Sequence, residues 1–389
     1  MTMNRPSVLI VGSGIGGLTA AIALRAKGIP VEICEAAPAP RKSGTALGIA
    51  CNATKVLRAL GIDLGDGRCG QATERLEVRT ATGELLRALP APTITAQLGN
   101  PIVCIGRDDL MAILRDACGD TPIHYSTKAV GVDDAGERPA IRCADGRVLS
   151  ADVVVGADGI GSVVRAAVAG QKPPTEAGYV CWLATVNFSH PRIVRGYTGQ
   201  YWGHGQRFGL TDIGGGTAYW WGTKNMAASQ ARHGQVAKRD IIEAYRGWAP
   251  EVVDVINVTP EATIVSVPAL DRPFLSQWGR GAVTLLGDAA HPMLDALGQG
   301  ASSAIEDGYV LAEALDKASN LVAALRTYED VRRKRTRMLV RSARRLSRLE
   351  QTENRVIRAV RNYAVAHAPS RMLAPMYARP LRFDLEGLL

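Results

Sequence analysis

A glycine-rich turn close to the start of the chain constrains the fold more than any other stretch. The apolar run Val8–Val11 predicts a buried strand. Directly after it come three glycines, Gly12, Gly14 and Gly17, and then an Ala/Leu-rich stretch that predicts a helix. In such a turn the first glycine permits a tight bend, the second lets backbone N–H groups approach a pyrophosphate, and the third lets helix and strand pack closely. The turn therefore favours a dinucleotide site, with the helix N-terminus facing the phosphates.

Three predicted strands each end beside an acidic residue. The run Val31–Cys34 leads to Glu35, 23 residues after Gly12, where a carboxylate can accept hydrogen bonds from a ribose diol. Two later apolar runs lead to Asp158-Gly159 and Gly287-Asp288. One parallel sheet would gather all three acids, because ligands bind at the carboxyl ends of its strands.

The stretch 178–267 differs in character from the rest. Apolar and polar residues alternate there, and it holds five of the six tryptophans, which predicts a mostly antiparallel sheet. A chain of 389 residues favours two domains. We therefore expect an α/β fold, in which a Rossmann-like nucleotide-binding domain carries an inserted β-sheet domain for the substrate and is followed by C-terminal helices. The expected boundaries are 1–177 with 268–330, then 178–267, and 331–389 for the C-terminal helical segment.

Cysteine usage and hydropathy exclude several classes of protein. The seven cysteines are scattered without a CxxC pair, which argues against a zinc site or a disulfide framework and favours a reducing cytoplasm. We expect no metal ion. No apolar run approaches the ~20 residues that span a bilayer, and the N-terminus lacks a signal-peptide pattern. The sequence leaves open whether the protein is a monomer or a homodimer.

The positive charge is concentrated at the C-terminal end. Residues 320–389 carry 16 basic and 6 acidic side chains, a charge of +10, whereas the whole chain carries +9. Such a basic segment either binds nucleic acid or an anionic membrane, or is a helix that is solvated or packed on an acidic body. No aromatic residue interleaves with the arginines of 332–348, and no nucleic-acid-binding motif is present. The second interpretation is favoured, and we expect no nucleic-acid partner.

Taken together, three motifs resemble those of the single-component, FAD-dependent aromatic hydroxylases of the p-hydroxybenzoate hydroxylase fold. The first is the glycine turn with Glu35, and the second is the segment 156–165, which contains Asp158. The third is the segment 287–292, which continues to Gly298-Gln299-Gly300 and Glu306-Asp307. The likeness extends over nearly the whole chain, and the salicylate, hydroxynicotinate and urate hydroxylases look most similar.

The resemblance implies a tightly bound, non-covalent FAD. Glu35 would hold the adenosine ribose, Asp288 would hold the ribityl chain, and the helix that begins near Gln299 would face the flavin. The glycine-punctuated stretch 44–48 would be flexible and let the flavin swing. With a single glycine fingerprint, NADPH or NADH would visit only transiently. The residues implied at FAD are Gly12, Gly14, Gly16, Gly17, Glu35, Ala36, Arg41, Gly48, Arg107, Val130, Asp158, Asp288, Gly298, Gln299, Gly300 and Ala301.

The resemblance also implies a reaction. NAD(P)H would reduce FAD, and O2 would then form a C4a-hydroperoxyflavin that hydroxylates or epoxidises an aromatic or polycyclic small molecule. Two alternatives stay open at this point. One is an FAD-dependent oxidase or reductase on the same fold without oxygen insertion, and the other is a non-catalytic FAD-binding regulator.

Two residues of the predicted sheet are candidates for catalysis. Arg207 and Tyr219 match positions that urate hydroxylases use at the flavin and substrate, so Arg207 would orient flavin or substrate and Tyr219 would polarise a substrate oxygen. The alternative is a structural arginine and a core tyrosine. Urate hydroxylases carry an asparagine where this chain has Cys181 before Trp182. That difference favours a less polar substrate than a purine.

The third motif departs from the family at one position. Four residues after His291 the family usually has a proline, but this chain has Asp295. In the family that proline lies close to the reacting edge of the flavin. A carboxylate there would act as a base toward a substrate hydroxyl, or destabilise an anionic reduced flavin, or point to solvent.

Overall fold

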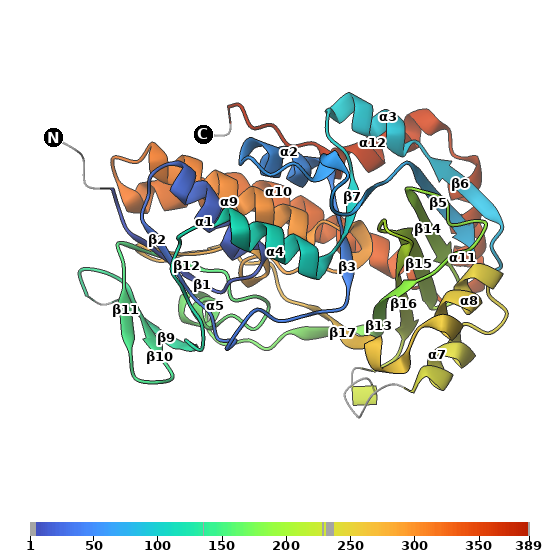
Figure 1. The fold of residues 1–389 in the computed structure, drawn as a ribbon, viewed down its shortest axis with the longest axis horizontal. Helices are drawn as coiled ribbons and strands as arrows, with labels where there is room; N and C mark the ends of the chain where they lie inside the picture. Colours follow the sequence, from blue (N-terminus) through green and yellow to red (C-terminus); the bar gives the residue numbers. More distant parts are fainter. Residues whose placement is uncertain (1–4, 135, 228, 231–236, 388–389) are drawn as a thin grey trace.

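The computed structural model describes residues 5–134, 136–227, 229–230 and 237–387. Two large sheets lie at opposite ends of the molecule, and helices pack along and around them (Figure 1). The fold is the expected α/β architecture. The helices that pack around the first sheet are α1 (Ile15–Ala26), α4 (Arg107–Ala117), α5 (Val163–Ala169), α9 (Gly300–Asp316) and α10 (Leu321–Glu350).

The first sheet is parallel and gathers the three predicted acids at one edge. Its strand order is β18-β12-β1-β2-β8. The strands are β18 (Val283–Leu285), β12 (Val153–Gly156), β1 (Val8–Val11), β2 (Val31–Cys34) and β8 (Ile123–His124). Every residue of β1, β12 and β18 is buried, as expected for a sheet covered on both faces. Glu35, Asp158 and Asp288 each follow the carboxyl end of one of its strands.

Two small sheets flank the parallel sheet. One contains β9 (Ala129–Asp133), β10 (Ala140–Cys143) and β11 (Val148–Ser150), and the other contains β3 (Ala46–Ile49), β7 (Val103–Gly106) and β4 (Gln71–Ala72). The stretch expected to be a flexible loop is therefore largely a strand. Gly48 lies in β3 opposite Cys104, and β3 pairs with β7 along its whole length. Backbone hydrogen bonds hold this segment in place.

The second large sheet has seven strands in the order β17-β13-β16-β15-β14-β5-β6. Its central pairs are antiparallel, and β14 pairs in parallel with β5. The strands are β17 (Val265–Asp271), β13 (Thr175–Asn187), β16 (Thr217–Asn225), β15 (Gln206–Asp212), β14 (Tyr197–Trp202), β5 (Arg75–Thr80) and β6 (Leu85–Leu89). Because β5 and β6 come from the stretch 1–177 and β17 runs past 267, the expected boundaries do not match this sheet.

The aromatic side chains of this sheet divide between its two faces. Trp182, Phe208 and Trp220 are fully buried on one face, in a core shared with α7 (Lys238–Ala244) and α8 (Pro250–Val258). The strand register places Tyr219 and Trp221 on the opposite face, with Tyr179, Cys181 and Arg207. The tryptophan-rich stretch therefore places aromatic side chains on both faces of the sheet, and the second face carries Arg207 and Tyr219, the predicted catalytic residues. We call this second face the substrate face, after the substrate contacts that the sequence predicts for Arg207 and Tyr219.

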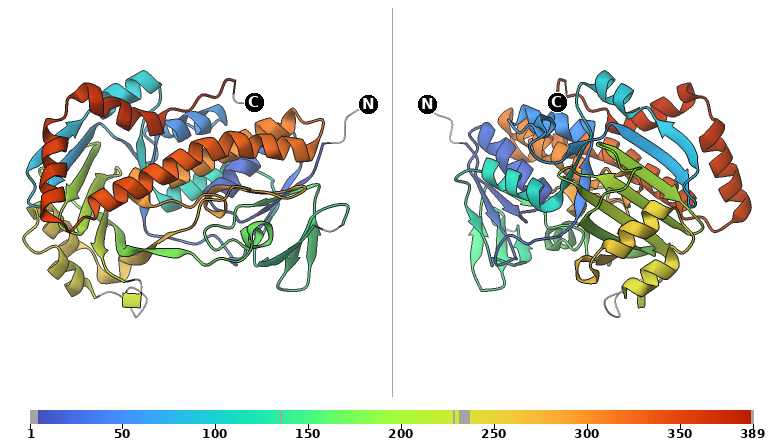
Figure 2. Two further views of the ribbon diagram at one scale, coloured as in Figure 1. Left: turned by 180° about the vertical axis from the view of Figure 1, so that it is seen from behind. Right: turned by 45° about the vertical axis from the view of Figure 1, so that its right-hand side comes forward.

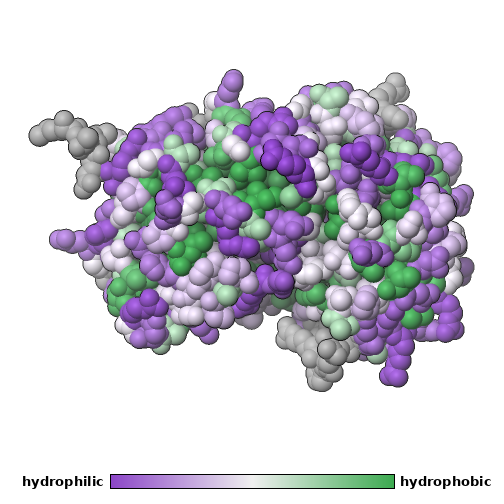
Figure 3. All heavy atoms as spheres, in the orientation of Figure 1, coloured by the Kyte–Doolittle hydropathy of each residue, from purple (hydrophilic) through white to green (hydrophobic). Residues whose placement is uncertain are grey.

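The C-terminal helices extend along the molecule. Figure 2 shows α10 running from the side of the parallel sheet to the side of the seven-stranded sheet. Further helices are α2 (Cys51–Ala59), α3 (Ala91–Leu98), α11 (Arg355–His367) and α12 (Ser370–Leu381). In the described ranges, no helix has both the length and the apolar character needed to cross a bilayer. On the face drawn in Figure 3, hydrophilic and hydrophobic residues are interspersed.

Candidate active site

The glycine turn has the close contacts that its spacing predicts. Gly12 has a φ of +105°, and a Cβ there would lie 2.6 Å from the carbonyl oxygen of Ala157. A Cβ at Gly17 would overlap the carbonyl oxygen of Gly12. At Gly14, where α1 begins, a Cβ would meet no atom within 4 Å. The turn is thus packed on two sides and open at Gly14, a concave surface that fits a pyrophosphate. Gly16 instead faces Leu286.

Glu35 is held against this turn. Its carboxylate accepts hydrogen bonds from the Ser13 N–H at 2.9 Å, the Ser13 hydroxyl at 2.8 Å and the Ala37 N–H at 2.8 Å. Burial opposes ionisation, but these donors outweigh it and lower the pKa of Glu35. Nearby, Ala36 and Arg41 are exposed. A charged acceptor beside an open turn is suited to a ribose diol.

Val130 lies on the neighbouring small sheet. Its exposed fraction is 52%. The N–H groups of Ser126 and Thr127 donate to the carbonyls of Ala37 and Glu35, respectively. These hydrogen bonds bring the start of β9 beside the end of β2, as a shared adenine-side site requires.

The second motif, the segment 156–165, caps helix α5 and is hydrogen-bonded to the third motif, which begins at Gly287. The Oδ2 atom of Asp158 accepts from the Val163 N–H at 2.7 Å, whereas Oδ1 is buried and has no hydrogen-bond partner in the described part of the chain. Burial raises the pKa of Asp158. Arg165 is buried and donates to the carbonyls of Ala289 and Ala290 at 2.9 and 3.0 Å. Asp158 thus keeps one buried acceptor oxygen unpartnered among the described residues, and Arg165 fixes the 287–290 turn.

Asp288 and Arg107 lie at the same edge. The Asp288 side chain reaches solvent, but the protein atoms packed around it restrict its hydration and raise its pKa. The charges of His291 and Arg107 oppose the rise. Arg107 begins α4, and its backbone N–H donates to the Thr45 carbonyl at 2.8 Å. This hydrogen bond links α4 to the segment that leads into β3. Asp288, predicted to hold the ribityl chain, and Arg107, predicted at FAD, thus lie within electrostatic reach of each other.

The N-terminus of α9 forms the third side of the site. Gly298 adopts the left-handed conformation, with a φ of +60°, and Gln299 is the N-cap of α9. The buried amide oxygen of Gln299 accepts from Asn52 Nδ2 at 3.0 Å. Gly300 and Ala301 form the first turn, whose N–H groups and dipole favour negative charge.

A buried ionic cluster lies directly beneath the third motif. Asp307 accepts from the Gly287 N–H at 2.9 Å, and its carboxylate lies 2.6 Å from His291 Nε2 and 2.6 Å from Arg332 Nε. Burial alone would raise the pKa of Asp307, but His291 and Arg332 outweigh it and hold the pKa at about 2. Arg332 also pairs with Glu306 at 2.6 Å. His291 therefore shapes the turn.

Several arginines of the basic C-terminal segment form ion pairs with carboxylates of the rest of the protein. Arg335 pairs with Glu306 at 2.7 Å, and Arg344 pairs with Asp271 at 2.5 Å. These arginines pack on acidic residues of the body, which is the interpretation that the sequence favoured for them. The partners are far apart in sequence, so residue spacing could not identify them.

The substrate face carries a second ionic cluster, in which Arg207 and Glu350 are buried and Asp295 is 44% exposed. Its guanidinium donates to Glu350 at 2.5 Å and to Asp295, and it lies 4.7 Å from the centre of the Trp221 ring. The Tyr179 hydroxyl donates to Asp295 at 2.8 Å. Burial opposes the charge of Arg207, but the two carboxylates raise its pKa. Sequence analysis missed Glu350 and Tyr179, because nothing in their local pattern points to Arg207.

Tyr219 lies on the same face as Arg207. Burial raises the pKa of its hydroxyl well above the usual value, Asp295 raises it further, and Arg107 opposes the rise. The charges of both Asp295 and Arg107 therefore act on this phenol. Trp220 is on the other face, where its indole N–H donates to Thr259 at 2.9 Å. Tyr219 thus shares the substrate face with Arg207, and both Tyr219 and Asp288 lie within the electrostatic influence of Arg107.

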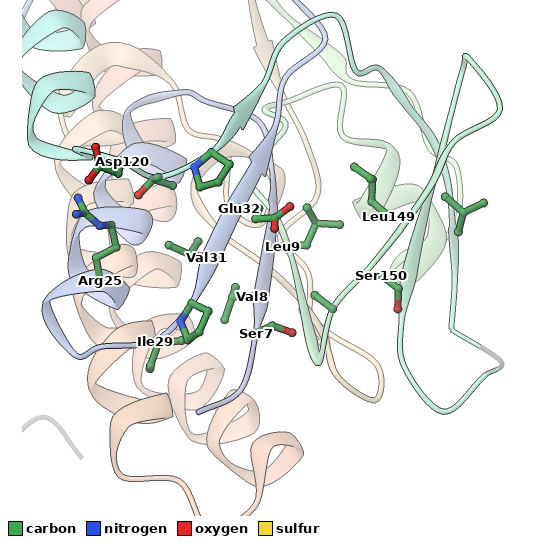
Figure 4. Close-up of a pocket in the computed structure, with 15 residues that line it drawn as sticks. Ser7, Val8, Leu9, Arg25, Ile29, Val31, Glu32, Asp120, Leu149 and Ser150 are labelled. Carbon is green, nitrogen blue, oxygen red and sulfur yellow. The ribbon is translucent and has the colours of Figure 1, made fainter. Parts of the chain in front are cut away.

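A separate pocket lies at the opposite edge of the parallel sheet (Figure 4). It has a volume of about 500 Å³ and is lined by residues at the amino ends of strands, among them Ser7, Pro30 and Thr121. None of the predicted site residues lines it. All seven cysteines are free. Within the described ranges, no group of three or more His, Cys, Asp or Glu side chains is arranged to hold a metal ion.

The fold and the three motifs at the edge of its parallel sheet define a flavoprotein of the p-hydroxybenzoate hydroxylase type. A family model described as "FAD binding domain" matches residues 5–343, and the chain belongs to this family. It is 36% identical over 348 residues to the aurachin C monooxygenase/isomerase of Stigmatella aurantiaca, covering 90% of each chain. It is also 36% identical over 350 residues to the chloroplastic zeaxanthin epoxidase of Oryza sativa, covering 85% of this chain and 53% of that protein.

Solved structures show the same relationship. HpxO of Klebsiella pneumoniae, in complex with FAD and uric acid, superposes with a TM-score of 0.89 at 25% identity, covering 96% of both chains. A salicylate hydroxylase–substrate complex has the same fold, with a TM-score of 0.78 at 21% identity and coverage of 98% and 99%. The protein is an FAD-dependent monooxygenase.

Proposed function

We propose that this protein is an NAD(P)H-dependent flavin monooxygenase that hydroxylates or epoxidises an aromatic or polycyclic small molecule. One observation carries the proposal most directly. Tyr219 and Arg207 share a sheet face, and Tyr219 lies within the electrostatic influence of Arg107, which also acts on Asp288. The names of relatives support the substrate class, since they include an aurachin C monooxygenase, a zeaxanthin epoxidase and an HpxO that binds uric acid.

The chain's own residues divide the work of binding the cofactor. The glycine turn and the α1 N-terminus would hold the pyrophosphate, and Glu35 would hold the ribose. Asp288 and Arg107 would hold the ribityl chain, and the α9 N-terminus would stabilise negative charge at the flavin ring. FAD, reduced by a nicotinamide, would supply the activation of O2 and the transfer of one oxygen atom.

We assign different roles to the three candidate catalytic residues. Tyr219 is held neutral by burial, so its hydroxyl would donate to a substrate oxygen and orient the substrate. Arg207 would keep a positive charge at the substrate face. Asp295 is bound by both Arg207 and Tyr179, which makes it a positioning residue for Arg207 rather than a base toward the substrate.

The substrate would be less polar than a purine. Cys181 is buried on the substrate face, packed with Tyr179 and Leu294. Burial raises the pKa of its thiol well above the usual value, so the thiol stays neutral. A small neutral side chain at this position offers neither the donor nor the acceptor of an amide. This favours an apolar ring at that point of the substrate.

The test follows NADPH and NADH oxidation over a panel of phenols, hydroxyquinolines, quinolones and polyketides, with product mass spectrometry. We expect at least one substrate to stimulate oxidation and to gain one oxygen atom. Substrate oxidation without oxygen gain would instead indicate an oxidase or reductase. Tyr219→Phe should raise KM for the substrate more than it changes kcat, because the hydroxyl orients the substrate.

A further inference from the structure

Helix α11 presents an apolar surface to solvent. Val356, Ile357, Val360 and Tyr363 have exposed fractions of 71%, 47%, 62% and 67%, and we call these four residues the apolar stripe. Their spacing places them on one side of the helix. Figure 2 shows α11 on the outer edge of the molecule, at the end opposite the parallel sheet. A surface helix normally turns its apolar side inward, so this outward stripe needs an explanation.

The inner side of α11 is held by polar anchors. Arg361 is buried, donates to the carbonyls of Leu349 and Glu350 at 3.1 Å, and lies 5.0 Å from the centre of the Trp202 ring. From β6, Arg87 donates to the carbonyl of Val365 at 2.6 Å. These anchors fix the helix with its apolar side outward. The stripe is thus a feature of the folded protein and does not come from a frayed helix end.

Exposed positive charge precedes the stripe in the chain. Arg348 lies in the last turn of α10 and Arg355 begins α11, and both are exposed, whereas Arg358 is half-buried on the inner side of α11 with Arg361. Across the described ranges, no carboxylate lies within ion-pair distance of these three arginines. The one acid between α10 and α11, Glu353, accepts a hydrogen bond from Asn225. Unlike Arg332, Arg348 and Arg355 therefore form no ion pair with any residue that the structure describes.

We propose that α11 docks the protein on the surface of an anionic lipid bilayer. The apolar stripe would enter the boundary between headgroups and acyl chains, and the arginines would meet lipid phosphates. The net charge of +10 on residues 320–389 favours this anionic surface over a second copy of the chain, which carries the same charge. The chain's net charge of +9 adds to the attraction. This docking does not depend on the identity of the substrate.

The FAD-loaded protein should be mixed with vesicles of phosphatidylcholine, with or without phosphatidylglycerol, and floated on a density gradient. We expect it to float with the anionic vesicles and to be released by salt. Val356→Asp with Val360→Asp should weaken binding by at least about tenfold. Val148→Asp is the matched control, because Val148 is 63% exposed on β11, away from the stripe.

A second pair of variants tests the charges. Arg348→Glu with Arg355→Glu should also weaken binding. Arg239→Glu with Arg246→Glu changes the net charge by the same amount on α7 and its C-terminal turn, and should leave most of the binding. Flavin absorbance and thermal unfolding establish that each variant is folded. Three results would overturn the proposal: wild-type protein that does not float, equal loss in variant and control, or a wild-type dimer that the aspartate pair converts to monomer.

Discussion

Arg207 of β15 and Glu350 of α10 are 143 residues apart, and their side chains form a buried ion pair with an Nη1–Oε2 distance of 2.5 Å. Arg207 also forms an ion pair with Asp295, so two carboxylates share one guanidinium group. Burial raises the pKa of Glu350 to about 7, although Arg207 opposes the rise. The substrate face therefore contains a group that binds a proton near neutral pH.

We predict a pH-dependent stability that Glu350→Gln removes. Because the pKa of Glu350 in the folded state lies above the ordinary 4.5, its protonation stabilises the fold fully below pH 4.5, and this stabilisation is lost as the pH rises through about 7. It amounts to at most about 3 kcal/mol. Denaturant unfolding between about pH 5 and pH 8 measures the effect.

The matched control for this prediction is Glu353→Gln, a nearby exposed glutamate. It should keep the wild-type pH dependence. If Glu350→Gln also kept it, another group would be responsible.

Asp295→Asn should lower the apparent pKa of the same transition. The charge of Asp295 is one of the causes that raise the pKa of Glu350, so removing that charge moves the transition to lower pH. We also expect more NAD(P)H to be oxidised without product, because Arg207 loses one of its two anchors. If the variant kept the pH midpoint of the stability transition, the carboxylates of Asp295 and Glu350 would not interact. If the variant lost oxygen transfer only at low pH, that result would support Asp295 as a base.

Two substitutions in the glycine turn distinguish an effect on FAD binding from an effect on folding. Gly14→Ala should fold like the wild type, because its Cβ meets no protein atom within 4 Å, but it should weaken FAD binding by about tenfold. Gly17→Ala should lower the unfolding temperature of the FAD-free protein as well, since its Cβ overlaps the Gly12 carbonyl. FAD titration and thermal unfolding of the FAD-free variants distinguish the two. Equal unfolding temperatures for the two variants would contradict this division.

Asp307→Asn should destabilise the protein by about 3–5 kcal/mol, because it removes a buried partner of Arg332 and His291. The pKa of Asp307 is lowered from 3.8 to about 2, so its contribution is present above pH 3.8 and is lost as the pH falls through about 2. Acid unfolding of wild type and variant measures this loss. The control, Asp316→Asn, breaks a partly exposed pair with Arg5 and should cost about 1 kcal/mol or less.

Local spacing accounts for the part of the site that the sequence predicted. A buried strand, a glycine turn and a following acid determine their own geometry, so Gly14 and Glu35 lie where they were expected. The three acids converge because parallel strands align their carboxyl ends, as Val11, Gly156 and Leu285 do in neighbouring registers.

The rest depends on contacts between distant segments. The partners of Arg207 and Arg332 come from other elements, and a run of arginines looks the same in sequence whether it is paired or free. In the same way, β5 joins β14 through backbone hydrogen bonds that carry no sequence signature. The sequence predicts a flexible segment around Gly48 because glycine has a low strand propensity, but pairing with β7 overrides that propensity.

Helix α10 contributes to both halves of the site. Arg332, near its middle, supports the turn at Gly287 through Asp307, and Glu350, at its end, holds Arg207. A chimera that exchanges only the seven-stranded sheet with a relative would leave the new sheet facing a foreign α10. Engineering of substrate preference in this protein should therefore treat the sheet and α10 as one interchangeable module, transferred together.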